Sequence, residues 1–324
     1  MSFPFNFFLT AFAGALGTTL LALPLWRQWC LRLGLVDDPG RRKIHDLPIP
    51  LAGGLAVLTG MLLPLVTGAI LLKLGVVRIS FAALIVHGIN RRAAELGIIA
   101  FGAIAITILG WYDDKHELKP LPKFAGQLLI AILVAMACKR ITLFVPSIVF
   151  SYVITVLWLL AVINAFNFID NMNGLCAGLG VIGAWFFALI AAANGEYLVA
   201  LIAFLICGAL LGFLPYNFPR ARAFLGDAGS HLVGYLLAVL AILPHFYTRQ
   251  NPHPLAVFSP LLVLAVPLFD LAWVVVWRTR ARRPFWVGDT NHLSHQLVRL
   301  GFSQTRAVLT LWLIAVVIGV LAAL

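Results

Sequence analysis

The sequence predicts an all-α protein that crosses a membrane many times, and three observations support this prediction. Of its 324 residues, 62% are hydrophobic and only 11% are charged, and the mean hydropathy is +1.01. The apolar residues form long runs, several of which reach the ~20 residues that a helix needs to cross a bilayer. The sequence contains neither an alternating strand pattern nor an internal repeat. We therefore expect a polytopic integral membrane helical bundle that forms one domain over residues 1–324.

About ten segments are long enough, or nearly so, to cross a membrane. They cover residues 5–25, 51–72, 95–112, 124–138, 148–168, 175–193, 198–216, 228–247, 255–277 and 306–324. A further apolar stretch, 79–89, is too short to span and is expected to lie on the surface. The four cysteines are scattered without paired spacing, so they predict neither a disulfide framework nor a metal site.

The net charge of +11 indicates where the loops lie. Such an excess could bind nucleic acid, but no basic and aromatic surface domain is present to hold it, so we expect no nucleic-acid partner. Lys and Arg are enriched in cytoplasmic loops of membrane proteins. Placing both termini outside puts 16 of the 23 Lys and Arg residues inside, with the basic stretch 73–92 as the exception. The expected location is the inner (plasma) membrane.

In this topology the polar clusters all lie on the cytoplasmic side. They are residues 37–46, 113–114, 164–173, 217–227 and 292–295. A transporter of anionic solutes, the alternative from another class, would place polar groups near mid-membrane and often in broken helices. A scaffold protein would have no use for such clustering. Polar groups at helix ends on one face favour an enzyme that acts at the inner membrane surface.

The stretch from Asn164 to Gly174 ends a long apolar run with amides and a carboxylate. Asn164, Asn167 and Asp170 are spaced three apart, so they share one face of a helix. Polar groups at membrane depth are costly and usually face a cavity or a partner. A single Asn could simply form hydrogen bonds that hold packed helices together. Three polar groups in one stripe favour a functional site instead.

Two acidic motifs could bind a cation. The adjacent carboxylates of Asp113 and Asp114 repel each other and so favour a cation or a shared proton, although they could merely end the helix. Asp227 stands where a helix should begin and could be an N-cap. A carboxylate at that position could equally hold Mg²⁺ that bridges phosphates near the helix N-terminus.

Basic groups accompany these acids. His292 and His295 lie three apart in the most basic loop, where contact with phosphate oxygens is a better explanation than a zinc site. Asp270, a lone acid inside a span, should pair with a base or face the same cavity. Acids ringed by Lys, Arg and His suit a metal-bound polyphosphate, and the membrane location suggests that a second substrate is a lipid.

These residues resemble the polyprenyl-phosphate N-acetylhexosamine-1-phosphate transferases of glycosyltransferase family 4, over most of the chain and in the family's order. The matching motifs are Arg42-Lys43-Ile44-His45 with Pro48, Pro50, Gly53 and Gly54; Asp113-Asp114 with Lys123; Asn164 to Asp170; Phe224 to Ser230; and His292 to His295. The resemblance implies transfer of a sugar-1-phosphate from a UDP-sugar to undecaprenyl or another polyprenyl phosphate, which leaves UMP. Mg²⁺ is the expected cofactor, with Mn²⁺ as an alternative, and a homodimer is left open.

The resemblance also implies residue roles. Asp227 would hold the metal, Asp113 and Asp114 would sit beside the lipid phosphate, and Asn167 and Asp170 would line the catalytic floor. Phe224 would stack on uracil, with Asn217 near the nucleotide. The groups that would neutralise phosphates are Lys43, His45, Lys123, His292 and His295. Whether attack is direct or passes through an aspartyl intermediate stays open.

Two positions depart from the family pattern. Asn173 replaces a carboxylate that would touch the nucleotide, which removes a charge and adds a donor, and Ser294 stands where many relatives have His. The loop 41–54 resembles the N-acetylglucosamine branch, so we expect UDP-GlcNAc as the donor. The phospho-N-acetylmuramoyl-pentapeptide transferase is the alternative within the family.

Overall fold

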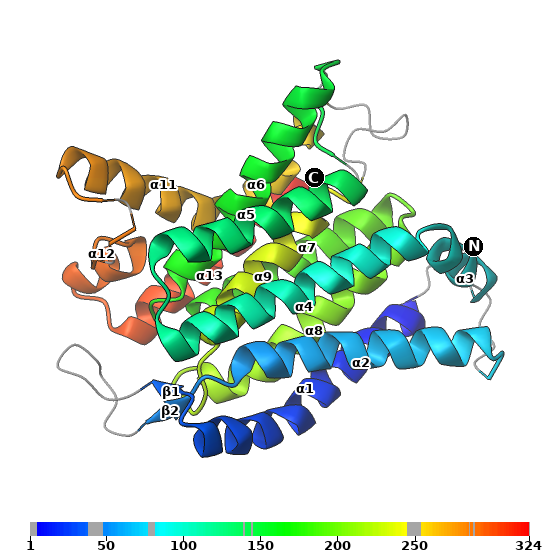
Figure 1. Cartoon of the computed structure of the whole chain (residues 1–324), viewed down its shortest axis with the longest axis horizontal. Helices are drawn as coiled ribbons and strands as arrows, with labels where there is room; N and C mark the ends of the chain where they lie inside the picture. The colour runs from blue at the N-terminus through cyan, green and yellow to red at the C-terminus, as the bar shows by residue number, and fades with distance from the viewer. Residues whose placement is uncertain are drawn as a thin grey trace.

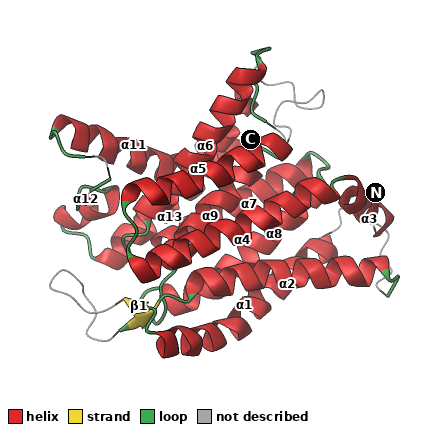
Figure 2. Cartoon of the chain, viewed as in Figure 1, coloured by secondary structure: helices red, strands yellow, loops and turns green. Residues whose placement is uncertain are grey.

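The computed structural model is a bundle of helices with one small antiparallel pair of strands (Figure 1), and Figure 2 shows how little of it is strand. It describes residues 5–37, 48–76, 82–138, 140–143, 145–244, 254–284, 286–287 and 289–323. The helices are α1 (Phe5–Leu33), α2 (Gly53–Lys73), α3 (Ala82–Arg91), α4 (Ala93–His116), α5 (Pro120–Ala137), α6 (Ile148–Ile169), α7 (Leu175–Ala193), α8 (Tyr197–Asn217), α9 (Gly226–Leu240), α10 (Ser259–Val263), α11 (Ala265–Arg280), α12 (Leu293–Arg299) and α13 (Gln304–Ala323), and a 3-10 turn covers Pro254–Phe258. Strands β1 (Val36–Asp37) and β2 (Ile49–Pro50) pair Val36 with Pro50 and Asp37 with Ile49.

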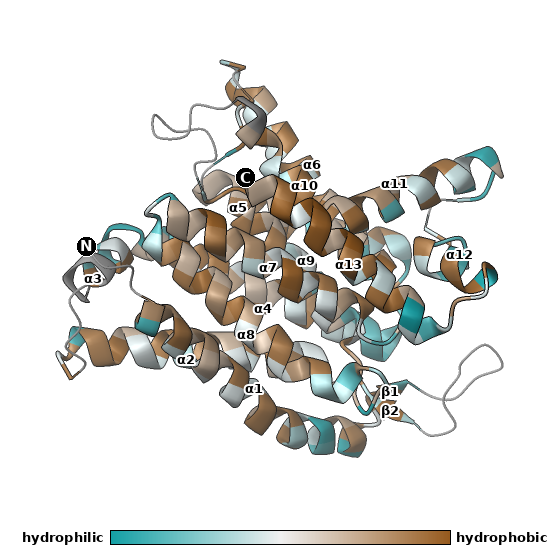
Figure 3. Cartoon of the chain, turned by 180° about the vertical axis from the view of Figure 1, so that it is seen from behind, coloured by the Kyte–Doolittle hydropathy of each residue, from teal (hydrophilic) through white to brown (hydrophobic). Residues whose placement is uncertain are grey.

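Eight helices of the described chain are long and apolar enough to cross a membrane: α1, α2, α4, α5, α6, α7, α8 and α13. They match eight of the ten predicted spans and confirm the all-α polytopic membrane fold. Large apolar side chains such as Leu21, Leu129 and Val149 are exposed, as contact with lipid requires. Figure 3 shows that hydrophobic residues predominate along the helices of the bundle. The short stretch at 79–89 corresponds to α3, a helix of ten residues.

The segment predicted as a span at 228–247 is helical over a shorter range, and residues 245–247 lie outside the described residues. Its counterpart α9 has 15 residues, which extend about 22 Å and fall short of the ~30 Å hydrocarbon core. Every residue from Ala228 to Leu240 is buried, because α9 packs against α2, α4, α6 and α7. The apolar sequence of α9 therefore reflects burial in protein rather than contact with lipid.

The predicted span at 255–277 is broken. Its two parts, Ala256–Val263 (which includes α10) and α11, meet at an angle of 69°. Pro267, in the first turn of α11, has no backbone N–H to continue the hydrogen bonding of α10, so an uninterrupted helix is disfavoured here. Beyond the break α11 diverges from the bundle (Figure 1) and exposes Phe269 and Trp273.

The segments that carry four of the five predicted polar clusters gather at one end of the bundle, which we call the polar end, and residues 38–46 of the fifth lie outside the described residues. It comprises the β1–β2 pair, the turns 117–119, 170–174 and 218–225, and α12 (Figure 1). Helix α3 lies at the opposite end. The chain therefore brings the polar clusters of distant segments together, as the predicted topology requires.

Candidate active site

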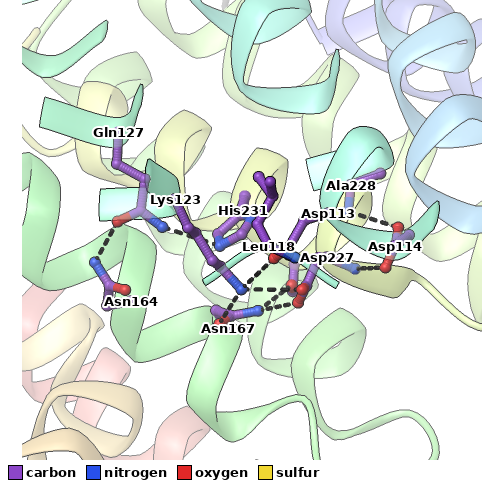
Figure 4. Close-up of polar contacts among 11 residues, drawn as sticks. Asp113, Asp114, Leu118, Lys123, Gln127, Asn164, Asn167, Asp227, Ala228 and His231 are labelled. Atoms are coloured by element: carbon purple, nitrogen blue, oxygen red, sulfur yellow. Dashed lines mark hydrogen bonds and ion pairs between the residues drawn. The ribbon is translucent and has the colours of Figure 1, made fainter. Parts of the chain in front are cut away.

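Lys123 is the centre of the polar end. It lies in the first turn of α5, and its Nζ atom is 2.7 Å from Asp113 Oδ2 of α4 and 2.9 Å from Asp227 Oδ2 of α9 (Figure 4). Nζ also donates to Asn167 Oδ1 of α6 at 3.4 Å. Four predicted site residues from four helices thus meet at one ammonium group.

Asp227 is held by two neighbours and remains open to solution. Lys123 contacts one carboxylate oxygen, and Asn167 Nδ2 donates to the other at 2.5 Å. The same Asn167 amide donates to Ser230 Oγ at 3.0 Å, one turn along α9. Because the Asp227 side chain is still 31% exposed, it is both positioned by the protein and accessible to a ligand.

The two adjacent acids at the end of α4 face different partners. Asp113 Oδ2 faces Lys123, while Asp113 Oδ1 accepts the backbone N–H of Leu118 at 2.8 Å. Asp114 accepts the backbone N–H groups of Asp227 at 2.7 Å and Ala228 at 3.1 Å. The expected N-cap of α9 is therefore supplied by Asp114 from another helix, where its negative charge also interacts favourably with the helix dipole.

Two glycines allow α4 and α9 to touch at this point. A Cβ atom on Gly110 of α4 would lie 2.4 Å from the carbonyl oxygen of Asp227. Gly226 has a φ of +68°, and a Cβ atom there would lie 2.5 Å from Asp114 Oδ2. Backbone contact between the two helices, rather than side-chain packing, therefore sets how closely the acids approach each other.

Asp170 follows the last residue of α6, next to this cluster. Burial and the nearby negative charge of Asp227 raise the pKa of Asp170 to about 7. The carboxyl group therefore titrates near neutral pH, unlike an ordinary aspartate.

Two predicted nucleotide contacts, Asn217 and Asn173, connect loops. The buried Asn217 accepts the backbone N–H of Gly174 at 2.6 Å and donates to the carbonyl of Ala223 at 3.0 Å. Asn173 Nδ2 donates to the carbonyl of Pro219 at 3.2 Å. The amides thus tie the 170–174 turn to the 218–225 loop, and their nucleotide contacts stay predictions.

Asp270 pairs with a base, as expected of an acid buried at membrane depth. Its Oδ2 lies 2.7 Å from His292 Nδ1, and its Oδ1 accepts the backbone N–H of Leu293 at 2.7 Å. His292 therefore precedes α12 in a fixed orientation rather than sharing a helical face with His295. The two rings are 6.3 Å apart.

The pKa values of His295 and Asp289 are both lowered, which favours the neutral form of His295 and the ionised form of Asp289. Burial, with the positive charges of His292 and Arg299, lowers the pKa of His295, which favours the neutral ring. Burial disfavours the ionised form of Asp289, but hydrogen bonds from Arg278 (2.8 Å) and the N–H of Asn291 outweigh it and lower the pKa. Arg278, a buried cation over the Phe168 ring, was missed by sequence reasoning.

Phe224 is anchored through its backbone. Its N–H donates to the carbonyl of Pro50 at 3.0 Å, and its carbonyl accepts the N–H of Gly53 at 2.9 Å. The predicted stacking of its ring on a base stays a prediction. Lys43 and His45 lie outside the described residues.

Sequence reasoning also missed two buried polar residues close to the cluster, Gln127 and His231. Gln127 lies four residues after Lys123 on α5, and His231 lies four residues after Asp227 on α9. Helical spacing from the predicted residues would have found both.

The donor set around Lys123 fits a magnesium ion that is shared with a ligand. Asp113 and Asp227 already flank one cationic group, and all the oxygen donors here are hard ligands. Within the described residues no group of three or more His, Cys, Asp and Glu is arranged to hold a metal. One or two carboxylates completed by substrate phosphates and water is, however, the usual way in which proteins bind Mg²⁺.

Together, the fold and the site define a polytopic membrane protein whose acids, amides and a lysine converge at one end of the bundle. Residues 96–245 match the model of glycosyl transferase family 4. The chain is 31% identical over 320 residues to the probable undecaprenyl-phosphate N-acetylglucosaminyl 1-phosphate transferase of Bacillus subtilis, an alignment that covers 96% of this chain and 83% of that protein. It therefore belongs to glycosyl transferase family 4.

Two further relatives have similar names. The decaprenyl-phosphate N-acetylglucosaminephosphotransferase of Mycobacterium tuberculosis is 35% identical, covering 89% of this chain and 74% of its own length. The undecaprenyl-phosphate alpha-N-acetylglucosaminyl 1-phosphate transferase of Escherichia coli K12 is 29% identical, with coverage of 94% and 81%.

Proposed function

We propose that this protein transfers N-acetylglucosamine-1-phosphate from UDP-GlcNAc to a polyprenyl phosphate, giving the lipid-diphosphate-sugar and UMP. The observation that carries the proposal is the contact of the Lys123 ammonium with both Asp113 and Asp227. Such a site can bind a metal-bridged diphosphate and neutralise charge that moves between phosphates, which is the main task in phosphoryl transfer. The family membership and the names of the relatives support the same reaction.

Asp227 and Asp113 would hold the Mg²⁺, which supplies charge neutralisation on the diphosphate when it is bound. Lys123 would donate to a phosphate oxygen, and Asn167 keeps the Asp227 carboxylate in place through its hydrogen bond. Asp170 lines the floor of the site and would accept or release a proton near neutral pH. His292, oriented by Asp270, and His295 would donate to phosphates from the α12 side.

We place the polar end on the cytoplasmic side of the plasma membrane, because that topology puts 16 of the 23 Lys and Arg residues inside. The donor and the lipid phosphate would then reach the same face by different routes. The nucleotide-sugar would enter from water and the lipid from the bilayer. Lys43, His45, Phe224, Asn217 and Asn173 would contact the donor.

The test is transfer of radiolabel from UDP-GlcNAc to undecaprenyl phosphate by purified protein, with Mg²⁺ and with EDTA. We expect labelled lipid and released UMP only with Mg²⁺. Product from a UDP-N-acetylmuramoyl-pentapeptide donor alone would retain the chemistry and overturn the choice of sugar. Absence of product from every donor, with protein shown to be folded, would overturn the reaction class and favour transport.

A further inference from the structure

A second polar layer lies one helical turn away from the Lys123, Asn167 and Asp227 cluster, on the same three helices. It consists of Gln127, Asn164 and His231, which we call the deeper layer. Steps of three or four residues return to the same face of a helix. Each member of the cluster is thus joined to one member of the deeper layer by a single turn of α5, α6 or α9.

The deeper layer is a continuous hydrogen-bonded chain inside the bundle. Asn164 Nδ2 donates to Gln127 Oε1 at 2.8 Å, and Gln127 Nε2 lies 3.0 Å from His231 Nε2 (Figure 4). Gln127 and His231 are 1% and 0% exposed. Burying polar groups such as those of Gln127 and His231 costs free energy unless each is hydrogen-bonded, so apolar side chains would be the simpler choice at these positions.

The chain fixes the positions of the protons. Asn164 Nδ2 also donates to the carbonyl of Leu160 at 2.8 Å, and a carbonyl can only accept, so this atom must be the amide nitrogen. Gln127 consequently accepts through Oε1 and donates through Nε2. His231 must then accept at Nε2, which makes its ring neutral with the proton on Nδ1.

The hydrogen bonding of His231 does not maximise the stability of the folded protein. Nδ1 of His231 is buried, and the backbone of Asp227, four residues earlier on α9, is its hydrogen-bonding neighbour, but the contact does not reach normal hydrogen-bond geometry among the described residues. A buried donor left in that state destabilises a protein, and an apolar residue of similar size would remove the cost. The bond at its other nitrogen, to Gln127 Nε2, is a directional contact that this side chain makes with another helix.

We propose that the deeper layer is a positioning device for the proposed transferase reaction: the hydrogen bonds among Gln127, Asn164 and His231 fix the rotation of α5, α6 and α9, and so keep Lys123 and Asn167 on Asp227. Rotation of α5 or α9 about its axis would break the Gln127–His231 contact and the 2.9 Å Lys123–Asp227 contact together, because the two contacts are one turn apart on the same helices. His231 and Gln127 are positioning residues that need no contact with substrate. The expected effect on kcat rests on the proposed function, whereas the expected effect on the rotation of the helices does not.

Two variants of His231 and one control test the proposal. His231→Leu removes the acceptor, while His231→Gln restores one at a similar distance from the backbone. Tyr235→Phe is the matched control, since Tyr235 lies one turn further along α9, is buried, and donates to the carbonyl of Ile99 at 3.0 Å. All three proteins are compared with wild type as full-length chains in the same lipid nanodiscs.

We expect His231→Leu to lower kcat about 10- to 100-fold, the usual effect of removing an outer partner of a functional side chain, with both KM values nearly unchanged. His231→Gln should recover most of the loss. Tyr235→Phe should keep the wild-type kcat while lowering the unfolding temperature at least as much as His231→Leu. Loss of kcat in proportion to lost thermal stability across all variants would overturn the proposal.

A second readout does not depend on turnover. The backbone N–H groups of Asp227 and Ala228 are held by Asp114, so rotation of α9 should speed their hydrogen exchange in His231→Leu and not in Tyr235→Phe. Equal exchange in the two variants would overturn the positioning role. If wild type transfers no sugar phosphate, the proposed function fails, and the exchange comparison still decides on the deeper layer. Should His231→Leu not fold, Gln127→Met makes the same comparison.

Discussion

Asp114 and Asp227 are joined by a hydrogen bond from the backbone of one to the side chain of the other. The Asp114 carboxylate at the end of α4 accepts the N–H of Asp227 at 2.7 Å and, through its second oxygen, the N–H of Ala228. One acid of the adjacent pair thus holds the helix that presents Asp227, while the other, Asp113, faces Lys123. Neighbours in sequence therefore have separate tasks.

Asp114→Ala should destabilise the protein by about 1–2 kcal/mol, because it removes the cap of α9. The unfolding temperature in detergent should fall, and sugar-phosphate transfer should fall with it because Asp227 loses its support. Asp114→Asn is the control, since it keeps one acceptor and should lie between alanine and wild type. An alanine variant as stable as wild type would contradict the capping role.

Lys123→Met should reduce kcat by about 10²- to 10³-fold, the range found when one donor to a charged transition state is removed. The loss also leaves Asp113 and Asp227 facing each other without a cation. Lys115→Met is a suitable control, because Lys115 lies over the Trp111 ring at 5.6 Å and makes none of the site's ion pairs in the described chain. Similar activity in the two variants would remove Lys123 from the site.

Asp170 predicts a pH dependence with a definite sign. Its pKa is raised from 3.8 to about 7, so the folded state binds a proton more tightly than the unfolded state. The stability that this group contributes is fully present below pH 3.8 and is lost as the pH rises through about 7. Without Mg²⁺, wild type should therefore lose stability relative to Asp170→Asn over this interval, as unfolding temperatures measured across pH would show. A constant difference between the two proteins would contradict the raised pKa.

Asp270→Asn should lower kcat/KM about 10- to 100-fold by releasing His292 from its orientation. If the amide oxygen keeps the N–H of Leu293, the amide NH2 faces His292 Nδ1 and can only donate, so the ring must move its proton to Nε2, the reverse of what the carboxylate imposes. The measurement is a double-mutant cycle with His292→Ala. Additive losses would show that the two residues act independently.

Much of the site could be predicted from sequence because its residues stand at the ends of apolar runs. Lys123, Asn167 and Asp227 each do so, and on one membrane face such ends must converge. The membrane topology and the chemical types of these residues are enough to predict that they contact one another. The capping role of Asp114 was not predicted, because nothing in a local pattern shows that one helix caps another.

Two features of the fold could not be predicted from the hydropathy of the sequence. The short length and full burial of α9 could not be predicted, since an apolar helix surrounded by protein has the same composition as one surrounded by lipid. The 69° break between α10 and α11 was also missed, because its local signal is Pro267 in an otherwise apolar segment. The first difference concerns what surrounds a helix, which a single sequence does not record, whereas the second has a local signal in Pro267.

The contact of Gly110 with the carbonyl of Asp227 determines which changes this protein can accumulate. Because main chain rests on main chain there, the spacing of the acids is independent of the side chains that face the lipid. Apolar substitutions on the outer surface can therefore accumulate without changing that spacing. Conversely, a single methyl group added at Gly110 would push apart the two helices that hold the acids, although Gly110 itself carries no functional group.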